Sequence, residues 1–102
     1  MFTVVLWDTE KYQKIKLIEK YDENEKFLAQ SDQDHYPLLS RLTYCDEELF
    51  SNVELNKLLD EVNELKIKSV DTEVIAYLES VASMIAEAIR IHKSILITPF
   101  ID

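Results

Sequence analysis

Residues 51–93 decide the fold, and they read SNVELNKLLDEVNELKIKSVDTEVIAYLESVASMIAEAIRIHK. Their apolar side chains recur every three to four residues, which is the period of an amphipathic α-helix. Ser51 and Glu54 have the spacing of a capping box, so we expect a first helix to begin there. The apolar stripe of this helix consists of Leu55, Leu58, Leu59, Val62 and Leu65.

A second and longer helix should follow a short connection at residues 66–70. Asp71 or Thr72 can cap its start, and the periodic pattern continues to about Lys93. A histidine near its end, His92, can cap the last carbonyls or pack against the closing strand. The stripe of this helix consists of Val74, Leu78, Val81, Ile85, Ile89 and His92.

The sequence on either side of these helices favours strands. Residues 2–7 are β-branched and aromatic, and residues 12–18 alternate between lysines and apolar side chains, as in a strand with one wet face. We expect these two segments to form a hairpin. Residues 94–102 read as a closing strand that can pair with the hairpin, with Pro99 at a sheet edge. The predicted fold is therefore α+β, a small antiparallel sheet covered on one face by two helices, in a single domain over residues 1–102.

The predicted hairpin and helices are joined by less regular sequence. Residues 19–35 contain few apolar residues, so we expect a mobile acidic connection with one short element around Phe27. Pro37 suits the first position of a helix, which indicates a helical turn or two within residues 36–42.

The composition argues against enzymatic chemistry. The chain has no glycine, so it cannot build a glycine-rich phosphate loop. Its single cysteine, Cys45, precedes three acids that disfavour a reactive thiolate, which predicts a partly buried, inert side chain. The two histidines are far apart, and no metal-ligand spacing is present. We therefore expect no catalytic residues, no metal site and no cofactor.

The negative charge is concentrated in the middle of the chain. Residues 19–64 contain 13 acids and four bases, which accounts for the net charge of −9. A field of this sign repels nucleic acid and anionic membrane surfaces, and it attracts basic proteins. The start of the chain lacks the pattern of a signal peptide and no segment is long enough to span a bilayer, so we expect a soluble cytoplasmic protein.

We therefore predict a small acidic protein that binds and inhibits a basic protein. Acids would steer the encounter and neighbouring aromatic side chains would anchor it. The predicted partner-binding residues are Asp34, Tyr36, Tyr44, Asp46, Glu47, Glu48, Phe50, Asp60, Glu61 and Glu64. Two alternatives stay open: the acidic region serves only solubility, or the chain is a scaffold or oligomeric subunit that uses its helix faces and closing strand.

Two resemblances bear on this prediction. Tyr-Pro-Leu-Leu-Ser-Arg-Leu at residues 36–42, Glu-Leu-Phe at 48–50 and the leucines and Glu61 of the first helix resemble a group of small, mostly uncharacterised bacterial proteins. Residues 95–102 resemble the short acid-ended strand that closes those proteins. By size, charge and architecture, the chain is also similar to the immunity proteins of bacterial toxin–immunity systems, which implies a basic toxin, such as a nuclease, as its partner.

Overall fold

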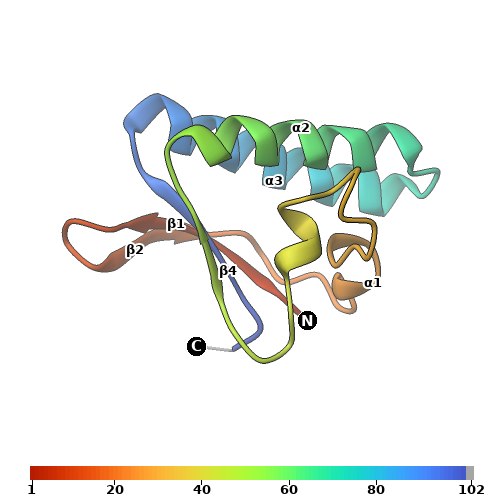
Figure 1. Ribbon diagram of the computed structural model, residues 1–102, viewed down its shortest axis with the longest axis horizontal. Helices are drawn as coiled ribbons and strands as arrows, with labels where there is room; N and C mark the ends of the chain where they lie inside the picture. Colours follow the sequence, from red (N-terminus) through yellow and green to blue (C-terminus); the bar gives the residue numbers. More distant parts are fainter. Residues whose placement is uncertain (101–102) are drawn as a thin grey trace.

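The structure is a computed structural model, described here for residues 1–100 (Figure 1). It confirms the predicted α+β class, with a four-stranded sheet and two long helices. The elements in chain order are β1 (Thr3–Asp8), β2 (Gln13–Leu17), α1 (Glu25–Leu28), the 3₁₀ helix η1 (Leu39–Arg41), β3 (Glu48–Phe50), α2 (Val53–Lys68), α3 (Thr72–Ile91) and β4 (Ser94–Thr98).

The sheet has the strand order β2-β1-β4-β3, and all of its neighbours are antiparallel. The predicted hairpin and its pairing with the closing strand are confirmed. The closing strand is shorter than predicted and ends at Thr98, and residues 101–102 of the predicted strand lie outside the described residues. The predicted position of Pro99 at a sheet edge is wrong, because β4 lies between β1 and a strand that the sequence analysis missed. That strand, β3, is only three residues long. Pro99 follows the last residue of β4, so its missing N–H costs the sheet nothing.

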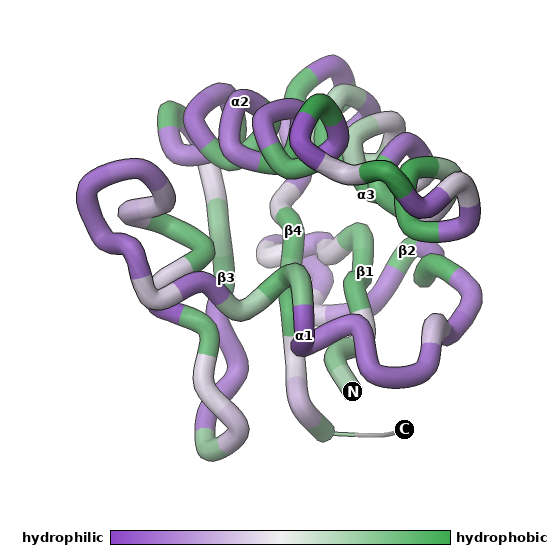
Figure 2. The backbone as a smooth tube through the Cα atoms, turned by 90° about the vertical axis from the view of Figure 1, so that its right-hand side faces the viewer, coloured by the Kyte–Doolittle hydropathy of each residue, from purple (hydrophilic) through white to green (hydrophobic). Residues whose placement is uncertain are grey.

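Helices α2 and α3 lie side by side on one face of the sheet, as predicted (Figures 1 and 2). The face of the sheet that the helices cover excludes solvent, because β1 and β4 direct fully buried aliphatic side chains toward the helices. The strands contribute Val4, Leu6, Phe50, Ile95 and Ile97 to this core, and the helices contribute Leu55, Leu58, Leu78, Val81 and Ile85. No helix of the described chain is both long and apolar enough to cross a membrane.

Of the two helix caps predicted from the sequence, one is present in the structure and the other is not. Asp71 caps α3 as predicted, since its carboxylate accepts hydrogen bonds from the backbone N–H groups of Glu73 and Val74. The capping box predicted at the start of α2 is wrong. Asn52 occupies the cap position without a side-chain cap bond, and Ser51 instead shares a hydroxyl hydrogen bond of 2.9 Å with Ser94.

Helix α3 ends at Ile91, two residues before the expected end at about Lys93. His92 adopts the left-handed conformation with φ 58°. The N–H of Lys93 then donates to the carbonyl of Ala88, which closes the helix as glycine usually does. The His92 side chain is exposed, so it belongs to the cap and not to the buried stripe.

The chain makes its other left-handed turns without glycine as well. Among the described residues, Tyr12, Glu23 and Asn52 also have φ near +60°. Such a conformation costs a residue with a Cβ about 1 kcal/mol or more. The fold therefore tolerates local backbone strain at four turns.

The segment at residues 19–35 is anchored at its centre and not simply a loose connection. The short element predicted around Phe27 is α1. Asn24, just before it, is fully buried: its amide accepts from the N–H of Phe2 at 2.7 Å and donates to the carbonyl of Phe2 at 2.7 Å and to the hydroxyl of Tyr77 at 3.0 Å. Leu28 is also buried, whereas residues 31–35 are exposed.

Candidate functional site

The predicted partner-binding residues do not form one surface. Three of the ten lie inside the molecule, and two acids, Glu48 and Glu64, are paired with the chain's own cations. Apart from Glu48, the residues at the surface divide into two groups on different parts of it. The three residues that the structure removes from a binding surface are Tyr36, Phe50 and Glu61.

Glu61 is a structural anchor. Its side chain extends from α2 toward the start of η1, and only 4% of the residue is exposed. One carboxylate oxygen accepts from the backbone N–H groups of Leu38 and Leu39 at 3.2 and 2.9 Å, and the other accepts from Leu38 at 3.2 Å. These amides have no carbonyl partner at the beginning of a helical turn, and a carboxylate satisfies them well. The predicted partner contact at Glu61 is therefore corrected to a contact within the chain.

Tyr36 and Phe50 belong to the core, and each lies under a cation. Tyr36 has the ammonium group of Lys68 5.5 Å from its ring centroid, and its hydroxyl accepts from that group at 3.4 Å. Phe50 has the guanidinium of Arg41 5.1 Å above its ring. Because the core already uses their aromatic faces, neither ring is available to anchor a partner, and both predictions are corrected.

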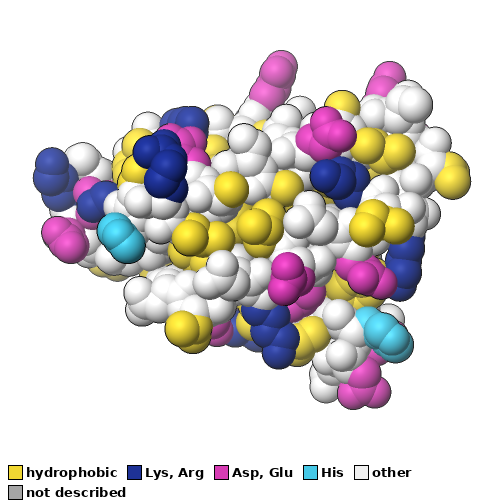
Figure 3. Space-filling model, turned by 90° about the horizontal axis from the view of Figure 1, so that it is seen from above, with side chains coloured by type: hydrophobic (Ala, Val, Ile, Leu, Met, Phe, Trp, Pro, Cys, Tyr) yellow, Lys and Arg dark blue, Asp and Glu magenta, His cyan; other side chains and the backbone are white. Residues whose placement is uncertain are grey.

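The chain's own cations neutralise part of the predicted acidic surface. Arg41 donates to Glu54 and to Glu48, both at 2.8 Å, and these hydrogen bonds raise its pKa above the usual value. Lys68 pairs with Glu64 at 3.2 Å, and the hydrogen bond to that carboxylate raises the pKa of Lys68. Figure 3 shows the consequence on the helix side of the molecule, where acidic and basic side chains alternate with apolar ones.

A first surface group of predicted residues surrounds a hollow of about 290 Å³ between residues 34–37 and α2. Asp34, Asp60 and Glu64 line it together with His35 and Lys57. His35 is held in place by a 2.7 Å contact between its Nδ1 and the carboxylate of Asp32 just outside the hollow. That side-chain hydrogen bond, together with the backbone N–H of His35, lowers the pKa of Asp32.

A second group lies in the loop that leads into β3. Tyr44, Asp46 and Glu47 are all exposed, and Tyr44 stacks on Phe2 with ring centroids 5.9 Å apart. Glu47 lines a hollow of about 390 Å³ on the open face of the sheet. The sequence analysis missed the residues that form the rest of this hollow, which are Trp7, Thr9, Tyr12, Leu49 and Leu96.

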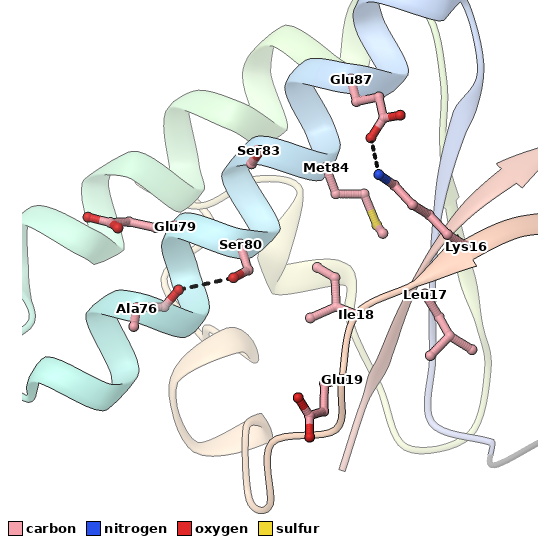
Figure 4. A pocket seen from close by; sticks show the side chains of 10 residues that line it. All are labelled: Lys16, Leu17, Ile18, Glu19, Ala76, Glu79, Ser80, Ser83, Met84 and Glu87. Carbon is pink, nitrogen blue, oxygen red and sulfur yellow. Dashed lines mark hydrogen bonds and ion pairs between the residues drawn. The ribbon is translucent and has the colours of Figure 1, made fainter.

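An open groove of about 500 Å³ separates β2 from α3 (Figure 4). Ile18 and Met84 form its apolar part, and Lys16 reaches across one end to pair with Glu87. The groove holds serines and acids but no arrangement of nucleophile and base. Ser80, for example, donates its hydroxyl to the carbonyl of Ala76 in the preceding turn.

The described part of the chain contains no group of three or more His, Cys, Asp or Glu side chains that could hold a metal ion. Cys45 is exposed, which corrects the expectation of a partly buried thiol. Comparisons of the chain with protein-family models, with curated proteins and with solved structures found no match.

Proposed function

We propose that this chain is a small acidic inhibitor that binds a basic protein. The observation that carries the proposal is the hollow formed by residues 34–37 and α2. Two of its carboxylates, Asp34 and Asp60, have no cationic partner among the described residues, and a third, Glu64, shares only an exposed pair with Lys68. Exposed pairs of this kind are weak and exchange readily for another cation.

The proposed mechanism is electrostatic capture followed by occlusion. Unpaired carboxylates raise the rate of encounter with a positively charged surface, and desolvation on docking strengthens each ion pair. The rigid scaffold suits this role, because Glu61 ties the loop that carries Asp34 and His35 to the helix that carries Asp60. A toxin of the kind opposed by immunity proteins, such as a nuclease, presents this chemistry in its Lys- and Arg-rich substrate site.

The test begins with the protein encoded beside this chain or captured with it from its native cell. The rate of association with that protein should fall steeply as salt is added, because the carboxylates act through a screened field. Replacing the three acids together (Asp34→Asn, Asp60→Asn, Glu64→Gln) should slow association about tenfold or more at low salt, with a smaller effect on dissociation.

A matched control removes the same number of charges elsewhere, with Glu10→Gln, Asp46→Asn and Glu47→Gln. If both triple variants slow association equally, the net charge acts and the hollow does not. If association is independent of ionic strength, or if no basic protein binds the chain, the proposed function is wrong.

A further inference from the structure

The face of the sheet that the helices leave open is apolar. The strand register places Leu17, Val5, Leu96 and Leu49 in one row across all four strands, on the side away from α2 and α3. Leu17 and Leu49, at the two ends of this row, remain 43% and 40% exposed. Figures 1 and 2 show no helix on this side of the sheet.

The central strands also have the sequence of strands that are covered on both faces. An antiparallel strand with one wet face usually alternates between apolar and polar residues, whereas a strand buried on both faces reads as a continuous apolar run. In β1 the run Val-Val-Leu-Trp occupies residues 4–7, and in β4 the run Ile-Leu-Ile occupies residues 95–97. In the described part of the chain the two long helices cover only one of these faces (Figure 1). On the other face Val5, in the middle of the row, is 2% exposed, and the apolar surface open to solvent lies at the ends of the row.

The hollow on the open face has two aromatic side chains at one side. Trp7 and Tyr12 meet edge to face with ring centroids 5.7 Å apart, and Tyr12 is 82% exposed. Across the hollow lie Leu49 and Leu96. Exposed aromatic residues beside an apolar depression are the usual anchors of a protein interface.

The charges at the rim of this face suit a second copy of the chain. The β2 side carries Lys11 and Lys14 with Glu10 between β1 and β2, and the β3 side carries Asp46 and Glu47. The rim therefore holds about one of the nine net negative charges, so two copies can approach here without strong repulsion. A twofold axis parallel to the strands would place the lysine side of each copy over the acidic side of the other.

We propose that two copies of this chain pack through the open faces of their sheets and form a symmetric dimer. The two sheets lie about 10 Å apart, as in other sheet-on-sheet packing, with Trp7 and Tyr12 of each copy against the apolar row of its partner. The acids that border the helix-side hollow remain free in this dimer. Tyr44, Asp46 and Glu47 then belong to contacts between copies and not to a basic partner.

The mass of the protein in solution tests the proposal directly. Sedimentation velocity across a wide concentration range should show a dimer that dissociates on dilution. The double variant Tyr12→Asn, Leu49→Thr should weaken the dimer about tenfold or more, because it removes an anchor and one end of the apolar row. Asn tolerates the left-handed backbone at residue 12, and Thr suits an edge strand, so the variant keeps its fold. Circular dichroism checks this.

The control removes two other exposed apolar side chains. Ile67→Ser, Val70→Ser lies at the connection between α2 and α3, where the side chains are 81% and 95% exposed, and it should leave the dimer unchanged. A chain that stays monomeric at every concentration overturns the proposal, and so does a dimer that the control variant weakens and the double variant does not.

Charge reversal tests the symmetry of the arrangement. Lys11→Glu or Glu47→Lys alone should weaken the dimer several-fold, and the two reversals combined should restore most of the affinity, because each edge still faces its opposite. A combined variant that is weaker than either single one excludes the proposed orientation. All of these measurements use the chain alone, so their outcome is independent of whether a basic partner exists.

Discussion

Strands β1 and β4 carry apolar side chains on both faces of the sheet, but the two faces have different surroundings. On the helix side, Leu6 and Ile95 are completely buried against α2 and α3. On the other side, Leu96 is half-buried and its neighbour Leu49 is 40% exposed. Apolar side chains are therefore fully enclosed on the helix side, whereas on the other face Val5 is buried and the ends of its row, Leu17 and Leu49, stay partly exposed. This difference makes the open face the place to look for association.

The largest effect should come from the same truncation made on each face. Leu6→Ala leaves a cavity in a closed core, and we expect it to lower the free energy of unfolding by about 2–5 kcal/mol. Leu49→Ala removes a side chain that is partly in water, and we expect a loss below about 1 kcal/mol. Urea denaturation at a concentration where the protein is monomeric measures both. Equal losses would mean that the open face is as important to the monomer as the covered one.

A second variant tests the buried hydrogen bonds that Asn24 makes to the residue preceding β1 and to α3. Asn24→Ala would leave the N–H and carbonyl groups of Phe2 and the hydroxyl of Tyr77 without their buried partner. Because unsatisfied buried groups are expensive, we expect a loss of about 3 kcal/mol. Faster hydrogen exchange at the start of β1 should accompany it.

The exposed Asn56→Ala on α2 is the matched control, and its effect should stay within about 0.5 kcal/mol. If Asn24→Ala is equally mild, the hydrogen bonds of the Asn24 amide are not what anchors residues 19–35.

The sequence predicts the covered face well, because long periodic helices and β-branched runs depend on local signals. It predicts α2, α3, the hairpin and the closing strand. It does not predict the three-residue strand β3, since so short a segment has no period of its own, and its pairing with β4 is a tertiary contact. The alternation in residues 12–18 identifies a strand but not its orientation. Lys16, on the face expected to be wet, is turned toward α3 and pairs with Glu87.

The candidate surfaces are harder to predict, because burial is decided by contacts between distant segments. Glu61 reads as a solvated acid on the polar side of a helix, yet its carboxylate accepts from amides more than twenty residues away. Phe50 reads as an interface aromatic, yet it is fully buried. The open face had a usable signal in the unbroken apolar run of β1, which an antiparallel strand with one wet face does not need.

A smaller effect concerns the turn that leads from the sheet into α2. Asn52 has φ 55° and ψ −124°, a conformation that favours glycine, and the N–H of Glu54 donates to the carbonyl of Ser51 across it. Asn52→Gly should therefore raise the free energy of unfolding by about 1 kcal/mol, since relief of strain exceeds the entropy that glycine adds to the unfolded chain.

Asn56→Gly, one turn into the same helix, should lower stability by about 0.3 kcal/mol, because asparagine already has a low helix propensity, and it serves as the control. Thermal unfolding of the two variants compares them. Destabilisation by both would show that Asn52 makes a favourable contact that outweighs its backbone strain.

The smallest effect depends on pH and concerns the turn that positions Trp7 and Tyr12 on the open face. The Asp8 carboxylate accepts from the N–H groups of Lys11 and Glu10, at 3.1 and 2.9 Å, and pairs with Lys93 at 3.4 Å. These interactions, chiefly the backbone hydrogen bond from Lys11, lower the pKa of Asp8 below its usual value.

The ionised carboxylate is favoured in the native state, so its stabilisation is complete above the pKa of the unfolded chain, near pH 4, and is lost as the pH falls through the lower native pKa. Asp8→Asn should therefore be less stable than the parent at neutral pH, and the difference should shrink in acid. A difference between Asp8→Asn and the parent that stays constant down to acid pH would mean that the charge of Asp8 does not hold the turn. The positions of Trp7 and Tyr12 on the open face would then depend on side-chain packing alone.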